Sequence, residues 1–284
     1  PYIFLLIDWS EPYSDPLRKQ YLPVASQMKP EHLFASFDSL YEEVDSPLSH
    51  LTHRYYDRAL ILLLNTCPHF CCYCNRSRKV GKSPQKPNDQ ELSKILHYIQ
   101  DHSEIEDVVL SGGDIALSQP DLIQFIGKAL LNIKHVRRVR LATKSLAVFP
   151  MKILSDDEWF DAISEIHKYG KERDKQVCIH THFSSPNEIS DWSLKASQKL
   201  FSEGIPVRNQ AVFQHGVNHE IQTQTLLVKK LSYMNIQPYY LFLPDMVPGI
   251  ENLRVSLQDG IEMEKALRGS TAGFNIPTIA CDLP

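Results

Sequence analysis

From about residue 55 onward, segments with the pattern of a β-strand alternate with segments with the pattern of an amphipathic helix. Six segments are strand candidates, at residues 59–65, 107–111, 137–142, 177–181, 207–213 and 238–242, and the first of them contains an apolar run of strand length. Between these segments apolar residues recur at helical spacing, as they do at Leu92, Ile95, Leu96 and Ile99. Because strands joined by crossover helices run parallel in one sheet, the pattern indicates an α/β domain.

Six strand-and-helix units predict a partial (β/α)6 barrel, since a complete eight-stranded barrel needs two more units than the chain contains. A last helix is expected at about residues 259–267. Residues 1–54 lack the alternation and contain several prolines and a short amphipathic stretch around Leu33, Phe37 and Leu40. We expect residues 1–54 to be an N-terminal extension that packs on the barrel or on a partner subunit, and residues 55–284 to be the barrel.

Composition and charge narrow the classes of partner. The chain has 284 residues, of which 43% are hydrophobic and 23% are charged, as is usual for a soluble globular protein. A net charge of −4 gives no reason to expect nucleic acid as a partner. No apolar run reaches the length that spans a membrane, and the apolar start is too short for a signal peptide. We therefore expect neither nucleic acid nor a membrane as a partner.

Four of the six cysteines lie in one segment, residues 67–74, which reads Cys-Pro-His-Phe-Cys-Cys-Tyr-Cys. The other two, Cys178 and Cys281, stand alone. This distribution is not a disulfide framework, and it indicates a reducing compartment, which we take to be the cytoplasm.

The cysteine segment directly follows the first expected strand, where α/β domains place their sites. Thiolates from Cys67, Cys71 and Cys74 can each bind one iron of a [4Fe-4S] cluster, which leaves the fourth iron open to a small molecule. The alternative is a zinc-binding interaction module. Zinc needs a fourth ligand, and His69 lies inside the loop, where it would strain a tetrahedral site.

A second motif, Ser111-Gly112-Gly113-Asp114, closes the second expected strand, and with the cysteine segment it resembles the radical S-adenosylmethionine superfamily. Within it, the chain is similar to the lysine 2,3-aminomutase family along nearly its whole length. The matching segments are residues 56–58, 75–78, 181–188, 209–212, 216–218, 238–240, 267–269 and 272–273.

This resemblance implies a [4Fe-4S] cluster on the three cysteines, with S-adenosylmethionine chelating the open iron. The turn at residues 111–114 would line the methionine end of S-adenosylmethionine, and its glycines would let the backbone approach a ligand closely. By itself, that motif is also typical of an ordinary turn at a strand end. His182 would border S-adenosylmethionine, although a lone histidine is equally compatible with a structural role.

The resemblance also implies pyridoxal phosphate. Arg58 would hold its phosphate, since a guanidinium suits phosphate geometry, and Gln210 would lie near the same cofactor. The family's pyridoxal lysine follows a glycine-rich segment after an Asp-Ala-Pro-like triplet. Here Asp282-Leu283-Pro284 matches the triplet, so this lysine is expected beyond residue 284.

Three charged residues are expected at the substrate. The resemblance implies that Arg76 binds the α-carboxylate of an amino acid, and that Asp245 and Asp282 bind a distant ammonium group. A buried cation needs paired carboxylates to offset its desolvation. A solvated basic run is the alternative for Arg76, and helix or turn caps are the alternative for the two aspartates.

The sequence also departs from the family pattern. Phe242 stands where the family usually has tyrosine, and Ser77 and Lys144 replace family arginines. These changes keep the radical machinery, but they leave the amino acid acted on open.

The expected function is a radical S-adenosylmethionine aminomutase that moves an amino group from Cα to Cβ. The resemblance implies a 5′-deoxyadenosyl radical acting on an amino acid held as a pyridoxal phosphate aldimine. Lysine is the first substrate considered, with arginine, glutamate or a protein-bound lysine as substitutes. The alternative enzyme is an epimerase or dehydrogenase that uses the radical without pyridoxal phosphate. Expected partners are a reductant protein such as flavodoxin or ferredoxin, and further copies of the chain in a homo-oligomer.

Overall fold

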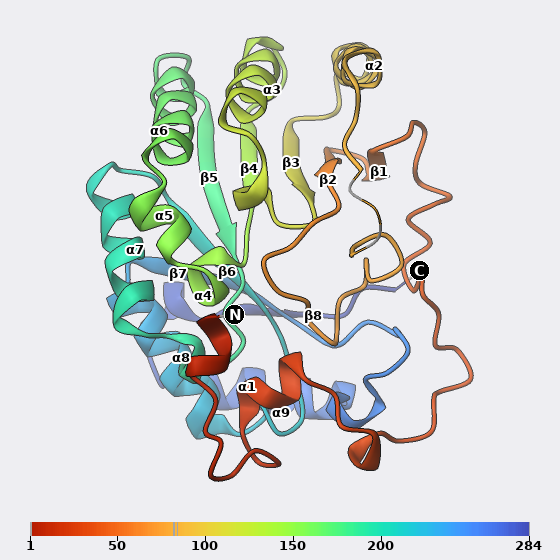
Figure 1. Ribbon diagram of the computed structural model, residues 1–284, viewed down its shortest axis with the longest axis vertical. Helices are drawn as coiled ribbons and strands as arrows, with labels where there is room; N and C mark the ends of the chain where they lie inside the picture. The colour runs from red at the N-terminus through yellow and green to blue at the C-terminus, as the bar shows by residue number, and fades with distance from the viewer. Residues whose placement is uncertain (1, 82, 84, 284) are drawn as a thin grey trace.

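One eight-stranded sheet organises the computed structural model, which describes residues 2–81, 83 and 85–283 (Figure 1). Its strands follow one another in chain order. β1 is antiparallel to β2, and every later neighbour is parallel. The strands are β1 Leu51–Tyr55, β2 Arg58–Leu64, β3 Asp107–Gly112, β4 Arg138–Ala142, β5 Gln176–Thr181, β6 Val207–Val212, β7 Ile236–Phe242 and β8 Thr278–Ala280.

The six predicted strands correspond to β2 through β7, and the predicted partial barrel is confirmed. β1 and β8 were not predicted. They extend the sheet at its two edges, where β1 pairs with β2 and β8 pairs with β7. The first predicted strand also begins one residue earlier than expected, so that Arg58 lies in β2.

Helices cover the outer face of the sheet, as Figure 1 shows for α2, α3 and α6. The α-helices are α1 Pro16–Tyr21, α2 Asp89–Asp101, α3 Pro120–Asn132, α4 Ser145–Val148, α5 Met151–Ser155, α6 Asp157–Lys171, α7 Asp191–Ser202, α8 Ile221–Tyr233 and α9 Leu257–Leu267. Short 3-10 helices span Tyr2–Leu5, Ala25–Gln27, Ile115–Leu117, Pro186–Glu188, Glu251–Leu253 and Gly273–Asn275. Among the described residues, no helix is both long and apolar enough to cross a lipid bilayer.

Local sequence explains where the helices start. Before α2, the Asn88 side chain accepts from the Glu91 backbone N–H at 3.0 Å, and the Glu91 carboxylate accepts from the Asn88 N–H at 2.9 Å. A similar reciprocal cap between Ser256 and Asp259 starts α9 at Leu257, two residues before the predicted helix. These caps satisfy backbone N–H groups that a helix start leaves without partners.

Side chains alternate between the two faces of the parallel strands, and this alternation creates the site. On β3, Val108 and Leu110 are fully buried in the core between sheet and helices. Val109 and Ser111, between and after them, line a cavity inside the barrel. Because successive side chains of a strand point to opposite faces, one strand supplies both core and site.

The N-terminal segment contacts the barrel directly. Ile3, Leu17 and Tyr21 are buried in the same hydrophobic core as the sheet and its helices. The expected amphipathic stretch is different, since Leu33 and Phe37 are largely exposed. The boundary expected after residue 54 falls within β1, and the division into extension and barrel stays a prediction.

Candidate active site

One cavity of about 880 Å³ is lined by every residue that the sequence analysis assigned to a site. Its wall runs from the loops after the strands down to Arg58 at the start of β2. The expected residues along it are Arg58, Cys67, Cys71, Cys74, Arg76, Ser111, Gly112, Gly113, Asp114, His182, Gln210, Asp245 and Asp282. The ligand that each one contacts stays a prediction.

The three expected cluster cysteines are free thiols on the loop after β2. Burial raises the pKa of Cys71 to about 12 and also raises the pKa of Cys67 and Cys74. A thiol held neutral by burial becomes a thiolate when a bound metal stabilises the negative charge, so this donor set suits an iron–sulfur cluster. Cys72 is not among the residues that line the cavity, although it is adjacent to Cys71.

Zinc makes a different geometric demand. Among the described residues, no three His, Cys, Asp or Glu side chains are placed around one position that could hold a single metal ion. A [4Fe-4S] cluster does not require such convergence, because each thiolate binds its own iron.

The turn at residues 111–114 is fixed against the base of the cysteine loop. Gly113 N donates to Leu64 O at 2.7 Å, and Asp114 N donates to Thr66 O at 2.8 Å. A Cβ at Gly113 would lie 2.0 Å from Thr66 O, so a larger residue fits there only if the backbone moves. The group that approaches the glycines here is the chain's own backbone, and the expected approach to a ligand stays a prediction.

Asp114 connects this turn to the segment after β4. Its buried carboxylate accepts hydrogen bonds from Ala116 N at 3.0 Å, Lys144 N at 2.9 Å and the hydroxyls of Thr143 and Ser145. Burial raises its pKa, although these bonds oppose the shift. Asp114 thus holds two strand ends together beside the cysteines.

His182 lies among polar side chains of the cavity wall. Its Nε2 is 3.1 Å from the Tyr73 hydroxyl and 2.9 Å from the Ser184 hydroxyl. Burial and the positive charge of Lys144 lower the pKa of His182, so the imidazole is neutral. Lys144 donates to His182 O at 2.8 Å and pairs at 2.9 Å with Glu188, which is fully buried. The sequence marked Lys144 only as a departure, but it also lines the cavity.

The first expected substrate aspartate, Asp245, is sensitive to the second, Asp282. Burial raises the pKa of Asp245 to about 6, and the charge of Asp282 contributes to the same shift. Asn75 Nδ2 donates to Asp245 Oδ2 at 2.9 Å, and the Tyr55 hydroxyl donates to Asp282 at 3.3 Å. Asn75, which the sequence did not single out for a role, thereby connects the cysteine loop to Asp245.

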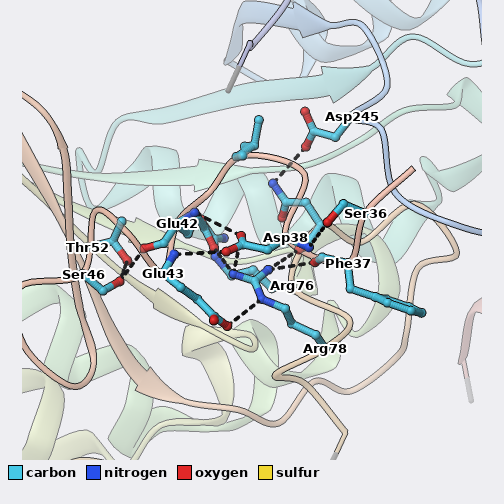
Figure 2. A network of polar contacts seen from close by, with 12 residues as sticks. Ser36, Phe37, Asp38, Glu42, Glu43, Ser46, Thr52, Arg76, Arg78 and Asp245 are labelled. Carbon is cyan, nitrogen blue, oxygen red and sulfur yellow. Dashed lines mark hydrogen bonds and ion pairs between the residues drawn. The ribbon is translucent and has the colours of Figure 1, made fainter. Parts of the chain in front are cut away.

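Arg76 does not stand alone in the cavity. Its Nη2 is 2.7 Å from Glu42 Oε1, in an ion pair with the N-terminal segment (Figure 2). Glu42 also lines the cavity. No pattern in the sequence identified Glu42, because it precedes Arg76 by 34 positions and meets it only in the folded chain.

Positive and polar groups gather at the inner part of the cavity. Arg58 pairs with Asp57 at 2.8 Å, and Arg140, which the sequence missed, pairs with Asp107 at 2.6 Å. The Tyr239 hydroxyl donates to Gln210 Oε1 at 2.9 Å and lies 3.1 Å from His180 Nδ1.

His180 completes this group. Burial, together with Arg140 and Arg208, lowers the pKa of His180 to about 3. Its Nε2 is buried with no hydrogen-bond partner among the described residues. The arginines of this group suit an anionic ligand such as a phosphate ester.

Comparisons with known proteins agree with this geometry. A family model described as a 4Fe-4S single cluster domain matches residues 58–155, which contain the cysteine loop and the glycine turn. L-lysine 2,3-aminomutase from Clostridium subterminale is 36% identical over 284 residues, covering 100% of this chain and 65% of its own length. This chain thus spans just under two thirds of that relative.

Two further comparisons extend the agreement. A protein from Aquifex aeolicus that is assigned provisionally as an L-lysine 2,3-aminomutase is 34% identical over 285 residues. The match covers 100% of this chain and 74% of that protein. A radical SAM methyltransferase from Sphaerobacter thermophilus has a similar fold, with a TM-score of 0.50 and 15% identity. That match covers 81% of this chain and 68% of the methyltransferase chain.

Proposed function

The chain belongs to the lysine 2,3-aminomutase family, and on this premise we propose that the protein is a radical S-adenosylmethionine enzyme that moves an amino group from Cα to Cβ of an amino acid. One observation carries the proposal. The three thiols, an arginine and two aspartates all line the same cavity. Such a cavity can hold a cluster beside a zwitterionic substrate with a second cationic group.

The donor sets described above suit both cofactors of this reaction. Cys67, Cys71 and Cys74 would hold the cluster, and Arg58 with Arg140 would hold the phosphate of pyridoxal phosphate. When bound, the cluster with S-adenosylmethionine supplies a hydrogen-abstracting radical, and pyridoxal phosphate supplies the conjugated system through which nitrogen migrates. The protein's own contribution is to position the reacting groups and to exclude water.

Substrate orientation would come from both charged ends of the amino acid. Arg76 would pair with the α-carboxylate, while Asp245 and Asp282 would bind an ammonium group on the side chain. This pair of carboxylates favours lysine, because a buried ammonium needs compensating negative charge.

Aromatic side chains from the N-terminal segment would limit solvent access near the cysteine loop. The His69 ring packs edge-on against Phe4 and Tyr21, with centroid distances of 5.2 Å and 4.7 Å. A substrate radical would be quenched by solvent or stray donors, so rings packed against His69 are consistent with this chemistry.

The decisive experiment is anaerobic incubation of the full-length protein with S-adenosylmethionine, a reductant, pyridoxal phosphate and a panel of amino acids. We expect β-lysine from L-lysine, detected by mass spectrometry. D-amino acids or desaturated products would instead indicate the epimerase or dehydrogenase. If S-adenosylmethionine is cleaved but no amino acid in the panel yields a β-amino acid, the aminomutase proposal is wrong.

A first prediction separates cluster binding from substrate binding. Cys71→Ala should abolish formation of 5′-deoxyadenosine, because the cluster loses one of its three protein ligands. Asp245→Ala should retain slow reductive cleavage of S-adenosylmethionine while weakening lysine binding.

Cys72→Ala is the matched control for Cys71→Ala. Cys72 neighbours Cys71 but does not line the cavity, so this variant should keep wild-type iron content and cleavage rate. Equal loss of iron in both variants would contradict the assignment of the cluster ligands.

A further inference from the structure

An acidic segment of the N-terminal region lies across the arginines that follow the cysteine loop. We name residues 36–46 the acidic strap, because it carries Asp45 and also Asp38, Glu42 and Glu43, which Figure 2 labels. The strap is connected at both ends: Ser36 N donates to Met246 O at 2.8 Å, and the Ser46 hydroxyl lies 3.2 Å from that of Thr52 in β1. It thus runs between the loop after β7 and the edge of the sheet.

Arg78 anchors the strap. Its guanidinium is 2.6 Å from Asp38 Oδ1 and 3.2 Å from Glu43 Oε1, and it donates to Phe37 O at 3.0 Å. Asp38 and Glu43 therefore serve to hold the strap against Arg78. Glu43 is mostly exposed and contributes no lining to the cavity.

Glu42 differs from these neighbours because it faces the cavity. The residue is 5% exposed, and its Oε1 is 2.7 Å from Arg76 Nη2, whereas Arg78 lies farther away at 3.5 Å. The Glu42 backbone is itself held, since its N–H donates to Asp38 Oδ1 at 3.0 Å and its carbonyl accepts from the Ser46 hydroxyl at 2.6 Å.

The orientation of Arg76 depends on this pair. Arg76 Nε is buried and has no hydrogen-bond partner in the described part of the chain, so Glu42 supplies the side chain's strongest contact. The Arg76 side chain keeps 23% of its surface exposed, and it lines the cavity. A guanidinium fixed at one Nη presents its remaining donors in a set direction, because the group is planar and rigid.

We propose that Glu42 is a positioning residue: it holds Arg76 in the orientation that recognises a substrate carboxylate, so the strap contributes to selecting amino acids over amines. This inference rests on the proposed role of Arg76. The alternative is that Glu42 merely competes with the substrate carboxylate for Arg76. In that case Glu42 weakens amino acid binding, and its removal would increase the preference for amino acids over amines.

The test compares each amino acid with its decarboxylated counterpart: L-lysine with cadaverine, L-arginine with agmatine, and L-glutamate with 4-aminobutyrate. Binding to the full-length protein, loaded with its cofactors and S-adenosylmethionine but without reductant, is measured by calorimetry. For the pair that binds best, we expect Glu42→Ala to reduce the preference for the carboxylate form by roughly ten- to hundred-fold, as misplacement of a binding group does. Affinity for the decarboxylated partner should stay near the wild-type value.

Two variants make the result specific. Glu43→Ala removes the neighbouring carboxylate of the strap and should leave the preference unchanged. Glu42→Gln keeps an oxygen that can accept from Arg76, so the preference should be intermediate, and this variant decides the question if Glu42→Ala does not fold.

Arg76→Ala distinguishes failure of the inference from failure of the proposed function. If Arg76→Ala abolishes the preference while the Glu42 variants keep or increase it, the positioning role is wrong and the Arg76 assignment stands. An equal loss of both ligands in the Glu42 variants would also overturn the inference. A preference that survives Arg76→Ala, or that is absent from the wild type, would overturn both proposals.

Discussion

Asp245 combines a raised pKa with a role that requires its charge. Burial and the charge of Asp282 raise its pKa to about 6, so the carboxyl group is protonated in acidic solution. The side-chain ammonium of lysine stays charged at these pH values. We predict that affinity for L-lysine weakens as pH falls below about 6, approaching tenfold per pH unit. Titrations between pH 5 and 7.5 would measure this.

The raised pKa of Asp245 also predicts that protonation, which weakens lysine binding, stabilises the folded protein. A carboxyl group whose pKa is higher in the folded protein than in the unfolded chain lowers stability as pH rises from the unfolded pKa to the folded pKa, and the full cost is present above the folded pKa. Asp245→Asn should therefore melt above the wild type at pH 7.5, and the difference should shrink toward pH 4. It should also bind lysine weakly with little pH dependence. A wild-type affinity that is constant from pH 5 to 7.5 would show that Asp245 is not the titrating group.

At the scale of elements, the contact between the β3 turn and the cysteine loop is constrained by Gly113. Because the Cβ of alanine would meet Thr66 O at 2.0 Å, Gly113→Ala must push the two backbones apart. Overpacking of this kind costs about 1–3 kcal/mol. We predict a lower melting temperature and a reduced iron content after anaerobic reconstitution.

Gly273→Ala provides the comparison for Gly113→Ala. No atom lies within 4 Å of a Cβ added at Gly273, so this variant should reconstitute like the wild type. Normal iron content in Gly113→Ala would mean that the close approach of the two backbones is not needed to hold the cysteine loop.

The predicted and unpredicted strands differ in their place in the strand-and-helix alternation. β2 through β7 were predicted because strand-length segments alternate there with amphipathic helices. β1 is followed by β2 after two residues with no helix between them, and β8 has only three residues. Both lie at sheet edges, where one side of the strand has no neighbour and the apolar signal is weak.

The site divides in a similar way. The cysteines and the turn at residues 111–114 were predictable because each is a local motif at the end of a strand. The partners Glu42 and Asn75 were not, since each acts on a residue distant in sequence, as Asn75 does on Asp245, 170 positions away. Pairings of that kind depend on how the barrel closes, which no local spacing records.

At the scale of the whole molecule, the N-terminal segment and the barrel share one core. Leu17 is fully buried in the cluster that contains the sheet, and the Tyr21 hydroxyl donates to the buried carboxylate of Glu188 in the loop after β5. We propose that residues 1–54 unfold together with the barrel rather than as a separate domain, because their buried apolar side chains pack in the core of the barrel.

Leu17→Ala tests this proposal. Removing a fully buried leucine side chain costs about 2–5 kcal/mol, and in a single cooperative unit that loss lowers one transition for the whole protein. We predict that far-ultraviolet circular dichroism and fluorescence report the same lowered melting temperature. Leu33→Ala, in the same segment at 95% exposure, should leave it unchanged. If Leu17→Ala produced an early partial transition while the barrel melted at its wild-type temperature, residues 1–54 would be a separate folding unit, and the strap could detach from Arg76 without unfolding the site.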